Sequence, residues 1–307
     1  MKSVLTIIAA LFIISSATSA KGKGDTYKVF YLGGQSNMDG YGYNKDLPDS
    51  LLQQLDDVYI FHGNSMGDDM PDGGLGIWAP LQTGHGVGFS SDGKKNTYSE
   101  RFGLELSFAY KLKQLYPNDK IAIIKYSKGG SSIDSVATRQ FGCWEPDFKG
   151  KIGINQYNHF LTTLKNAFTN SDINNDGKVD KLIPSGILWM QGESDADVTE
   201  DIALRYHANL KRLMDLIRAS LHSNDLPIVI GKISDSWNDE NGKVWPYGEL
   251  VQYAQEKFVN NDINAAIIRD TRYYKYSDPW HYNSEGYIHL GLRMAEEMNL
   301  LLNSNSK

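Results

Sequence analysis

The sequence predicts an α/β protein, a three-layer α/β/α sandwich with a mostly parallel central sheet. Short apolar runs rich in Val, Ile and Tyr alternate with segments in which apolar residues recur at helical spacing. This alternation is typical of parallel sheets covered by helices on both faces, because strands buried on both faces form continuous apolar runs. The chain has 307 residues, and we expect one domain over residues 21–307.

Six apolar runs flanked by Gly, Pro, Asn or Asp are the predicted strands. They lie at 27–32, 58–61, 121–126, 182–190, 228–233 and 265–268. Apolar periodicity predicts helices over 157–168 and 202–221, and a last helix that begins near Asn283 or Ser284. The stretch 63–98 is rich in Gly, Asp, Ser and Asn and lacks periodicity. It is interpreted either as the rim of an active site or as a surface insertion.

The first twenty residues match a secretory signal peptide. Lys2 is followed by an apolar run over 4–14 and by the small-residue sequence SSATSA, which ends at Ala20. The apolar run is too short to span a bilayer, and no later stretch reaches the length of about 20 apolar residues that a transmembrane helix needs. We therefore expect export to the periplasm or the extracellular space, with no membrane-spanning segment.

Composition narrows the range of partners. The formal charge is −6 and the sequence has no basic cluster, which disfavours nucleic acids and anionic membranes as partners. Cys143 is the only cysteine, so the fold depends on its core rather than on an internal disulfide. No base neighbours Cys143, and we expect a packed or partly exposed thiol. The sequence does not indicate an oligomeric state.

Polar residues follow three of the predicted strands. Ser36 lies just past the first strand in GGQSNM, where it is either a turn or cap residue or a nucleophile whose own N–H faces a developing oxyanion. Gly130 in SKGGSSI offers a backbone N–H, and Gln191 in QGESD offers a side-chain amide beside the carboxylate of Glu193. Because ligands bind at the carboxyl ends of parallel strands, we expect these groups at one edge of the sheet.

The C-terminal stretch YSDPWHYNSEGYIHLG places Asp278 three residues before His281. Pro279 keeps Asp278 out of helical geometry, so its carboxylate can orient the imidazole across a loop. A helix-capping aspartate beside a surface histidine is the alternative interpretation. Trp280 lies between them and is the aromatic residue favoured to contact a sugar, and His85 is a second candidate for substrate contact.

Four motifs in order, GGQSNM, KGGSS, MQGESD and DPWH, resemble those of the SGNH/GDSL hydrolases. The most similar branch is that of the sialate O-acetylesterases and acetylxylan esterases, carbohydrate esterase family 6. The resemblance spans almost all of the mature chain and implies a flavodoxin-like, SGNH-type esterase domain. It also implies Ser36 as nucleophile, His281 as general base and Asp278 as the acid that orients the base. The oxyanion donors that it implies are the N–H of Ser36, the N–H of Gly130 and the side chain of Gln191.

The third motif departs from the pattern of the wider superfamily. Where the superfamily has an asparagine in G-x-N-D, this sequence has G-E-S-D over 192–195. The donor role of Gln191 is therefore implied only by the resemblance to the sialate O-acetylesterase and acetylxylan esterase branch. Glu193 is a candidate for a second acid near His281.

The function implied by the resemblance is a serine esterase that removes O-acetyl groups from carbohydrates such as acetylated xylan or sialic acid. Its Ser-His-Asp mechanism requires no cofactor. One alternative is a carbohydrate-binding protein of the same fold with weak catalysis, which the intact triad disfavours. Another is an esterase, lipase or thioesterase with a non-sugar substrate. The polar stretch 63–98 does not suit a groove for an acyl chain.

The segment DINNDGKVD resembles the start of a calcium-binding loop. The oxygen-bearing side chains that would bind the ion are Asp172, Asn174, Asp176 and Asp180. The twelfth position of the loop is Ile183, so the bidentate glutamate that completes such loops is missing. An ion-free turn rich in Asn and Asp is the alternative. A calcium ion here would be structural, because the loop precedes the strand 182–190 and so lies at the opposite edge of the sheet from the polar strand ends.

Overall fold

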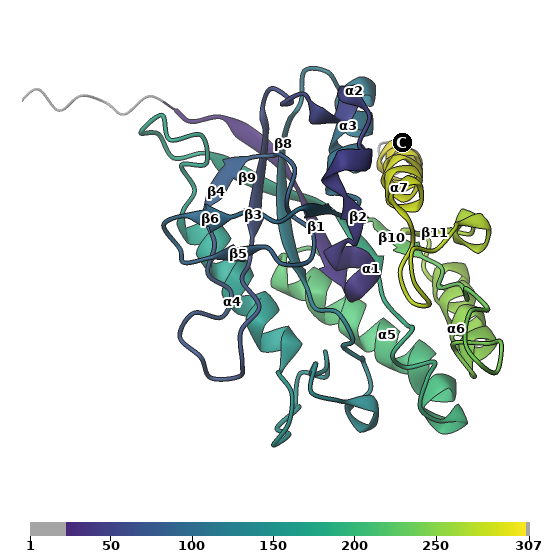
Figure 1. The fold of residues 1–307 in the computed structure, drawn as a ribbon. Helices are drawn as coiled ribbons and strands as arrows, with labels where there is room; N and C mark the ends of the chain where they lie inside the picture. The colour runs from purple at the N-terminus through teal and green to yellow at the C-terminus, as the bar shows by residue number, and fades with distance from the viewer. Residues whose placement is uncertain (1–22, 305–307) are drawn as a thin grey trace, which may run out of the picture.

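The computed structural model describes residues 23–304, so the predicted signal peptide lies outside the described residues. The strands of its central sheet are β1 (Thr26–Gly34), β3 (Val58–His62), β4 (Trp78–Pro80), β8 (Lys120–Ser127), β9 (Lys181–Met190), β10 (Ile228–Gly231) and β11 (Ala265–Ile268). They are arranged in the order β11-β10-β9-β1-β8-β3-β4 (Figure 1). Neighbouring strands are parallel, except that β4 runs antiparallel to β3.

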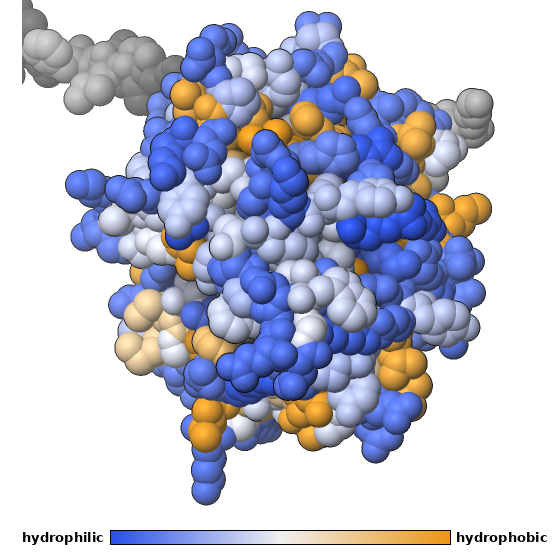
Figure 2. Space-filling model, turned by 45° about the vertical axis from the view of Figure 1, so that its right-hand side comes forward, coloured by the Kyte–Doolittle hydropathy of each residue, from blue (hydrophilic) through white to orange (hydrophobic). Residues whose placement is uncertain are grey.

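Helices cover both faces of this sheet. They are α1 (Ser36–Asp39), α2 (Asp49–Leu52), α3 (Glu105–Leu115), α4 (Gln156–Thr169), α5 (Glu200–Ser220), α6 (Gly248–Asn260) and α7 (Ser284–Ser304). The pair α3 and α7 packs together on one face, while α4, α5 and α6 lie on the other (Figure 1). None of the helices in the described part of the chain is long and apolar enough to cross a membrane. The face in Figure 2 is mostly hydrophilic, with apolar residues in small separate patches.

Strand β1 shows why the sheet needs two helical layers. Successive side chains of a strand point to opposite faces. The ring of Phe30 packs edge-on against Phe108 of α3, and the ring of the next residue, Tyr31, packs against Phe160 of α4. All four side chains are fully or almost fully buried, and each contributes roughly 2–3 kcal/mol through apolar burial. The hydrophobic core therefore fills both spaces between sheet and helices.

The predicted fold class is confirmed. All six predicted strands occur, and the predicted helices correspond to α4, α5 and α7. The stretch 63–98 is less irregular than expected, because it contains β4 and the hairpin of β5 (Ser90–Ser91) and β6 (Asn96–Thr97). A further short pair, β2 (Gly42–Tyr43) and β7 (Arg101–Phe102), also escaped sequence-based prediction.

The carboxyl end of β1 is the point where the order of strands reverses, because β8 and β9 flank β1 on its two sides. Backbone hydrogen bonds tie the three strand ends together. Gln35 N–H donates to the Met190 carbonyl at 2.9 Å, and Lys128 N–H donates to the Gly34 carbonyl at 3.1 Å. Gly34 has φ of 145°, and a Cβ there would lie 2.0 Å from the Met190 carbonyl oxygen. Only glycine fits this close approach.

Candidate active site

A cavity of about 680 Å³ opens at these strand ends. Ser36, Gly130 and His281 line it, although they are far apart in the sequence. Trp280 lines the same cavity and is half exposed. The fold therefore brings together the predicted nucleophile, the predicted base, one backbone donor and the predicted aromatic contact.

Ser36 begins helix α1 directly after strand β1. The N–H groups of Met38 and Asp39 both donate to the Gln35 carbonyl at 2.8 Å, which closes the sharp turn from strand to helix. Ser36 itself is 7% exposed, so its hydroxyl is accessible only from the cavity that it lines. A buried serine at the start of a helix has its own N–H free of intrahelical bonding.

Asp278 holds the ring of His281 in a defined orientation. His281 Nδ1 lies 2.8 Å from Asp278 Oδ2, and the N–H groups of Trp280 and His281 donate to Asp278 Oδ1 at 2.8 Å each. Burial opposes the charge of this carboxylate, but these hydrogen bonds outweigh it and lower the pKa of Asp278. The ring of Tyr41 stacks on the imidazole of His281, with 3.5 Å between the two ring centroids.

With Nδ1 committed to Asp278, Nε2 is the ring nitrogen available for proton transfer. Ser36 Oγ and His281 share the cavity, and no hydrogen bond joins them within residues 23–304. Such contacts are often long before substrate binds.

The loop after β8 lies directly on the nucleophile. A Cβ added to Gly129 would be 3.3 Å from Ser36 Cβ, and Gly129 N–H donates to Asp39 Oδ2 at 2.6 Å. Gly130 has φ of 74°, and a side chain there would collide with the ring of Phe141. Asp39 therefore fixes the loop that presents Gly130 to the cavity. Sequence reasoning missed this role, although Asp39 stands only three residues after the serine.

Gln191 does not fit its predicted role as an oxyanion donor. Its side chain is fully buried and is not part of the cavity lining. Both protons of its amide are in use, because Nε2 donates to Asp195 Oδ2 at 2.6 Å and to the Ser131 carbonyl at 3.2 Å. Its Oε1 accepts from the Tyr206 hydroxyl at 2.9 Å. These contacts make Gln191 a connection between the loops after β8 and β9.

Gln35 offers the side-chain amide that Gln191 does not. Its Oε1 accepts the N–H groups of Gly192 at 3.2 Å and Ser194 at 3.3 Å. Both partners are donors, so the oxygen faces them and the NH₂ group faces away. Gln35 lines the cavity, and its Nε2 donates no hydrogen bond to any residue that the structure describes. The only sequence signal was its position next to Ser36.

A family model for carbohydrate esterases, described as sialic acid-specific acetylesterase, matches residues 26–300. The chain belongs to this family. The family predicted from the four motifs is thereby confirmed, and the protein is a carboxylic ester hydrolase that acts on carbohydrates.

Several solved structures share the fold of this esterase. A protein from Arabidopsis thaliana is 20% identical with a TM-score of 0.60, and the match covers 90% of this chain and 98% of that one. XAC1771, a carbohydrate acetylesterase from Xanthomonas citri, is 18% identical with a TM-score of 0.61. The match covers 90% of this chain and 57% of that one. NanS is 16% identical with a TM-score of 0.58, and the match covers 92% of this chain and 99% of that one. No curated protein sequence gives a significant match.

Glu193 is not a second acid for His281. It is 1% exposed, does not line the cavity, and its Oε1 accepts from Asn37 Nδ2 at 2.8 Å. Burial raises the pKa of Glu193 to about 7, although the hydrogen bond from Asn37 opposes the rise. The carboxyl group is buried against Asn37 and does not face the cavity, which the sequence motif could not show.

His85 is completely buried and is not among the residues that line the cavity, so the structure does not support its predicted contact with substrate. Its Nδ1 lies 3.3 Å from His62 Nδ1, and its ring stacks on Phe89. Burial, and then the ammonium of Lys125, lower the pKa of His85 to about 3, so the ring is neutral at physiological pH. The residue of the 63–98 stretch that lines the cavity is Val87.

The rest of the cavity wall suits a polar ligand with apolar faces. Trp245 joins Trp280 in the lining, and such indole rings can lie against the apolar faces of sugars. Two cations of the lining are already paired, Arg139 with Asp197 and Lys243 with Glu249.

The predicted calcium loop is held by its own hydrogen bonds. Asp180 Oδ1 and Oδ2 accept the N–H groups of Asp25 and Ile173, and the Asp176 carboxylate pairs with Lys178. Asp172 accepts the N–H groups of Asp176 and Gly177. Over residues 23–304, no three His, Cys, Asp or Glu side chains are arranged to hold a metal ion. Calcium binding by this loop stays a prediction.

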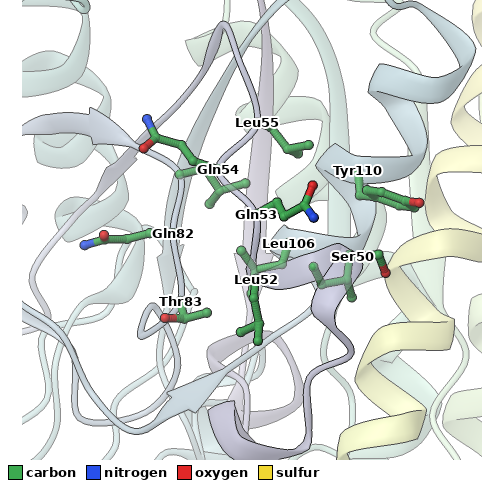
Figure 3. Close-up of a pocket in the computed structure, with 11 residues that line it drawn as sticks. Ser50, Leu52, Gln53, Gln54, Leu55, Gln82, Thr83, Leu106 and Tyr110 are labelled. Carbon is green, nitrogen blue, oxygen red and sulfur yellow. The ribbon is translucent and has the colours of Figure 1, made fainter.

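A second cavity of about 230 Å³ lies at α2 and α3 (Figure 3). It is lined by leucines, glutamines, Ser50, Thr83 and Tyr110, with no acid and no histidine. The side chains in Figure 3 therefore offer no pair of groups for acid and base catalysis.

Proposed function

We propose that this esterase removes O-acetyl groups from carbohydrates through an acyl-enzyme formed on Ser36. The observation that carries the proposal is the shared cavity of Ser36 and His281, with Asp278 fixing the imidazole at 2.8 Å. A nucleophile, a base and a group that orients the base are the parts that serine esterases need.

In the first step, His281 Nε2 takes the proton of the Ser36 hydroxyl as its oxygen attacks the acetyl carbonyl carbon. The tetrahedral intermediate then collapses, the bond from the carbonyl carbon to the sugar oxygen breaks, and His281 gives its proton to that oxygen. Water attacks the acetyl-enzyme in the same way, releasing acetate and restoring the Ser36 hydroxyl. The bonds that form and break in these steps belong to Ser36, His281, the ester and water.

Three donors are proposed to stabilise the oxyanion: the N–H of Ser36, the N–H of Gly130 and the side-chain amide of Gln35. Hydrogen bonds fix two of these donors in place. The loop of Gly130 is fixed by the bond from Gly129 N–H to Asp39, and the Gln35 amide is fixed by the N–H groups of Gly192 and Ser194. Such preorganised donors contribute roughly 10²- to 10³-fold each to kcat.

The sugar is proposed to lie against Trp280 and Trp245. Substrates to compare are O-acetylated sialic acid, which the family description names, and O-acetylated xylan, which the motif resemblance adds. We also propose that residues 1–20 direct export, so that the esterase meets its glycan outside the cytoplasm.

The test is acetate release from both glycans and from p-nitrophenyl acetate, with p-nitrophenyl octanoate as a long-chain comparison. Ser36→Ala should abolish turnover, while the control Ser185→Ala should keep it, because the Ser185 hydroxyl donates to the Ile183 carbonyl of its own strand. Preference for octanoate would support a lipase, and glycan binding without acetate release would support a sugar-binding protein. Either result would refute the proposal.

A further inference from the structure

Asn37 follows the proposed nucleophile and uses its entire hydrogen-bonding capacity. Its Nδ2 donates to Glu193 Oε1 at 2.8 Å and to the Trp280 carbonyl at 3.2 Å. Its Oδ1 accepts from Tyr282 N–H at 3.3 Å and from the Tyr287 hydroxyl at 2.8 Å. The residue is 1% exposed, so losing any partner would leave a buried polar atom unsatisfied.

The partners of Asn37 include both chain neighbours of the proposed base. Trp280 and Tyr282 flank His281, and Asn37 binds the carbonyl of one and the N–H of the other. Asn37 is also covalently joined to Ser36. One side chain therefore links two loops that lie 243 residues apart in the sequence, and these loops carry the nucleophile and the base.

Glu193 accepts one of the two N–H groups of the Asn37 amide. The Trp280 carbonyl can only accept and the Tyr282 N–H can only donate, so the NH₂ group of Asn37 faces Trp280 and Glu193 and the amide oxygen faces Tyr282. The other carboxyl oxygen, Oε2, is buried and has no hydrogen-bond partner among the residues described. A buried carboxyl group that makes one side-chain contact is costly to keep, so that contact is the feature to explain.

We propose that Asn37 and Glu193 form a positioning pair that holds the His281 loop against the Ser36 turn. This inference rests on the proposed function of Ser36 and His281. The pair touches neither the cavity nor the reacting atoms, and it acts through the backbone on both sides of the base. Because misplacing a catalytic group by about 1 Å can cost about 10²-fold in rate, the pair controls kcat rather than substrate affinity.

The experiment compares Glu193→Gln with Glu193→Leu. Glutamine keeps an oxygen that accepts from Asn37, whereas leucine has a similar size and no acceptor. Leucine should lower kcat on p-nitrophenyl acetate about 10- to 100-fold with KM nearly unchanged, and glutamine should restore kcat to within about threefold of wild type. Asn299→Ala is the matched control, since it removes a 2.7 Å bond from α7 to Tyr116, the residue after α3, away from the cavity. It should lower Tm without lowering kcat.

A second readout does not depend on turnover. The Nδ1–H proton of His281, bound to Asp278, should give a downfield NMR signal that disappears in His281→Ala. The signal should shift or broaden in Glu193→Leu and stay unchanged in Glu193→Gln. If Ser36 proves not to be the nucleophile, the NMR signal of His281 still tests whether Asn37 and Glu193 position the His281 loop. Wild-type kcat and an unshifted signal in Glu193→Leu would overturn the proposal, as would equal losses in both variants.

Discussion

Replacing Gln35 by alanine separates the two glutamines that compete for the role of oxyanion donor. The amide of Gln35 is held by backbone N–H groups at 3.2 and 3.3 Å and faces the cavity, whereas both amide protons of Gln191 are bound inside the protein. Loss of one preorganised donor raises the barrier by roughly 3–4 kcal/mol, which is about 10²- to 10³-fold in kcat. We therefore expect Gln35→Ala to lower kcat by that factor with a small change in KM.

The assay is steady-state hydrolysis of p-nitrophenyl acetate, with Tm measured in parallel. Gln191→Ala should lower Tm, because it breaks three buried hydrogen bonds. Gln82→Ala, on the rim of the second cavity, is the control for loss of a glutamine and should change neither quantity. Two results together would refute this assignment. Gln35→Ala would keep kcat within threefold of wild type, and Gln191→Ala would keep its Tm while its kcat falls about 10²-fold.

Three further predictions concern the orienting acid, the sugar contact and a buried carboxyl group. Asp278→Asn should lower kcat at least about 10²-fold at neutral pH, because the asparagine cannot stabilise the imidazolium; pH–rate profiles that match wild type would contradict this. Trp280→Ala should raise KM about 10-fold on acetylated glycans and leave p-nitrophenyl acetate hydrolysis unchanged, whereas equal effects on both would exclude a sugar contact. Burial raises the pKa of Glu193 from 4.5 to about 7, so the native state holds a proton that the unfolded chain releases, and stability is lost as pH rises through this window. Urea unfolding at pH 5 and pH 7 should show that Glu193→Gln removes roughly 2 kcal/mol of this loss, and an identical pH dependence in both proteins would contradict the shift.

The sheet was predictable from sequence because its strands are buried on both faces. Such strands form continuous apolar runs, and the run that becomes β1 carries Phe30 and Tyr31 into separate helical layers. Edge strand β4 has three residues, too few for a pattern to emerge. Helix α3 has a weaker pattern, because Glu105 is buried on it and pairs with buried Lys125 at 2.9 Å. A buried charge at a core position hides the periodicity on which prediction relies.

The sequence led us to propose Ser36, His281 and Asp278 for catalysis because each stands in a motif at a strand or loop end. It did not separate Gln35 from Gln191, since both are glutamines at the ends of neighbouring strands. Only the hydrogen bonds made after folding show which amide is left facing the cavity. The same reason applies to Glu193, whose partner Asn37 lies 156 residues away in the sequence.

The central claim is that an acetyl group passes through Ser36. Rapid acid quenching of the esterase during turnover of p-nitrophenyl acetate, followed by peptide mass spectrometry, measures this directly. We predict one acetyl group on the peptide that contains Ser36 and none on that peptide in Ser36→Ala. In a His281→Ala enzyme that still reacts, the amount of acetylated peptide should increase. Wild-type turnover by Ser36→Ala, or acetyl groups only on another residue, would contradict the account.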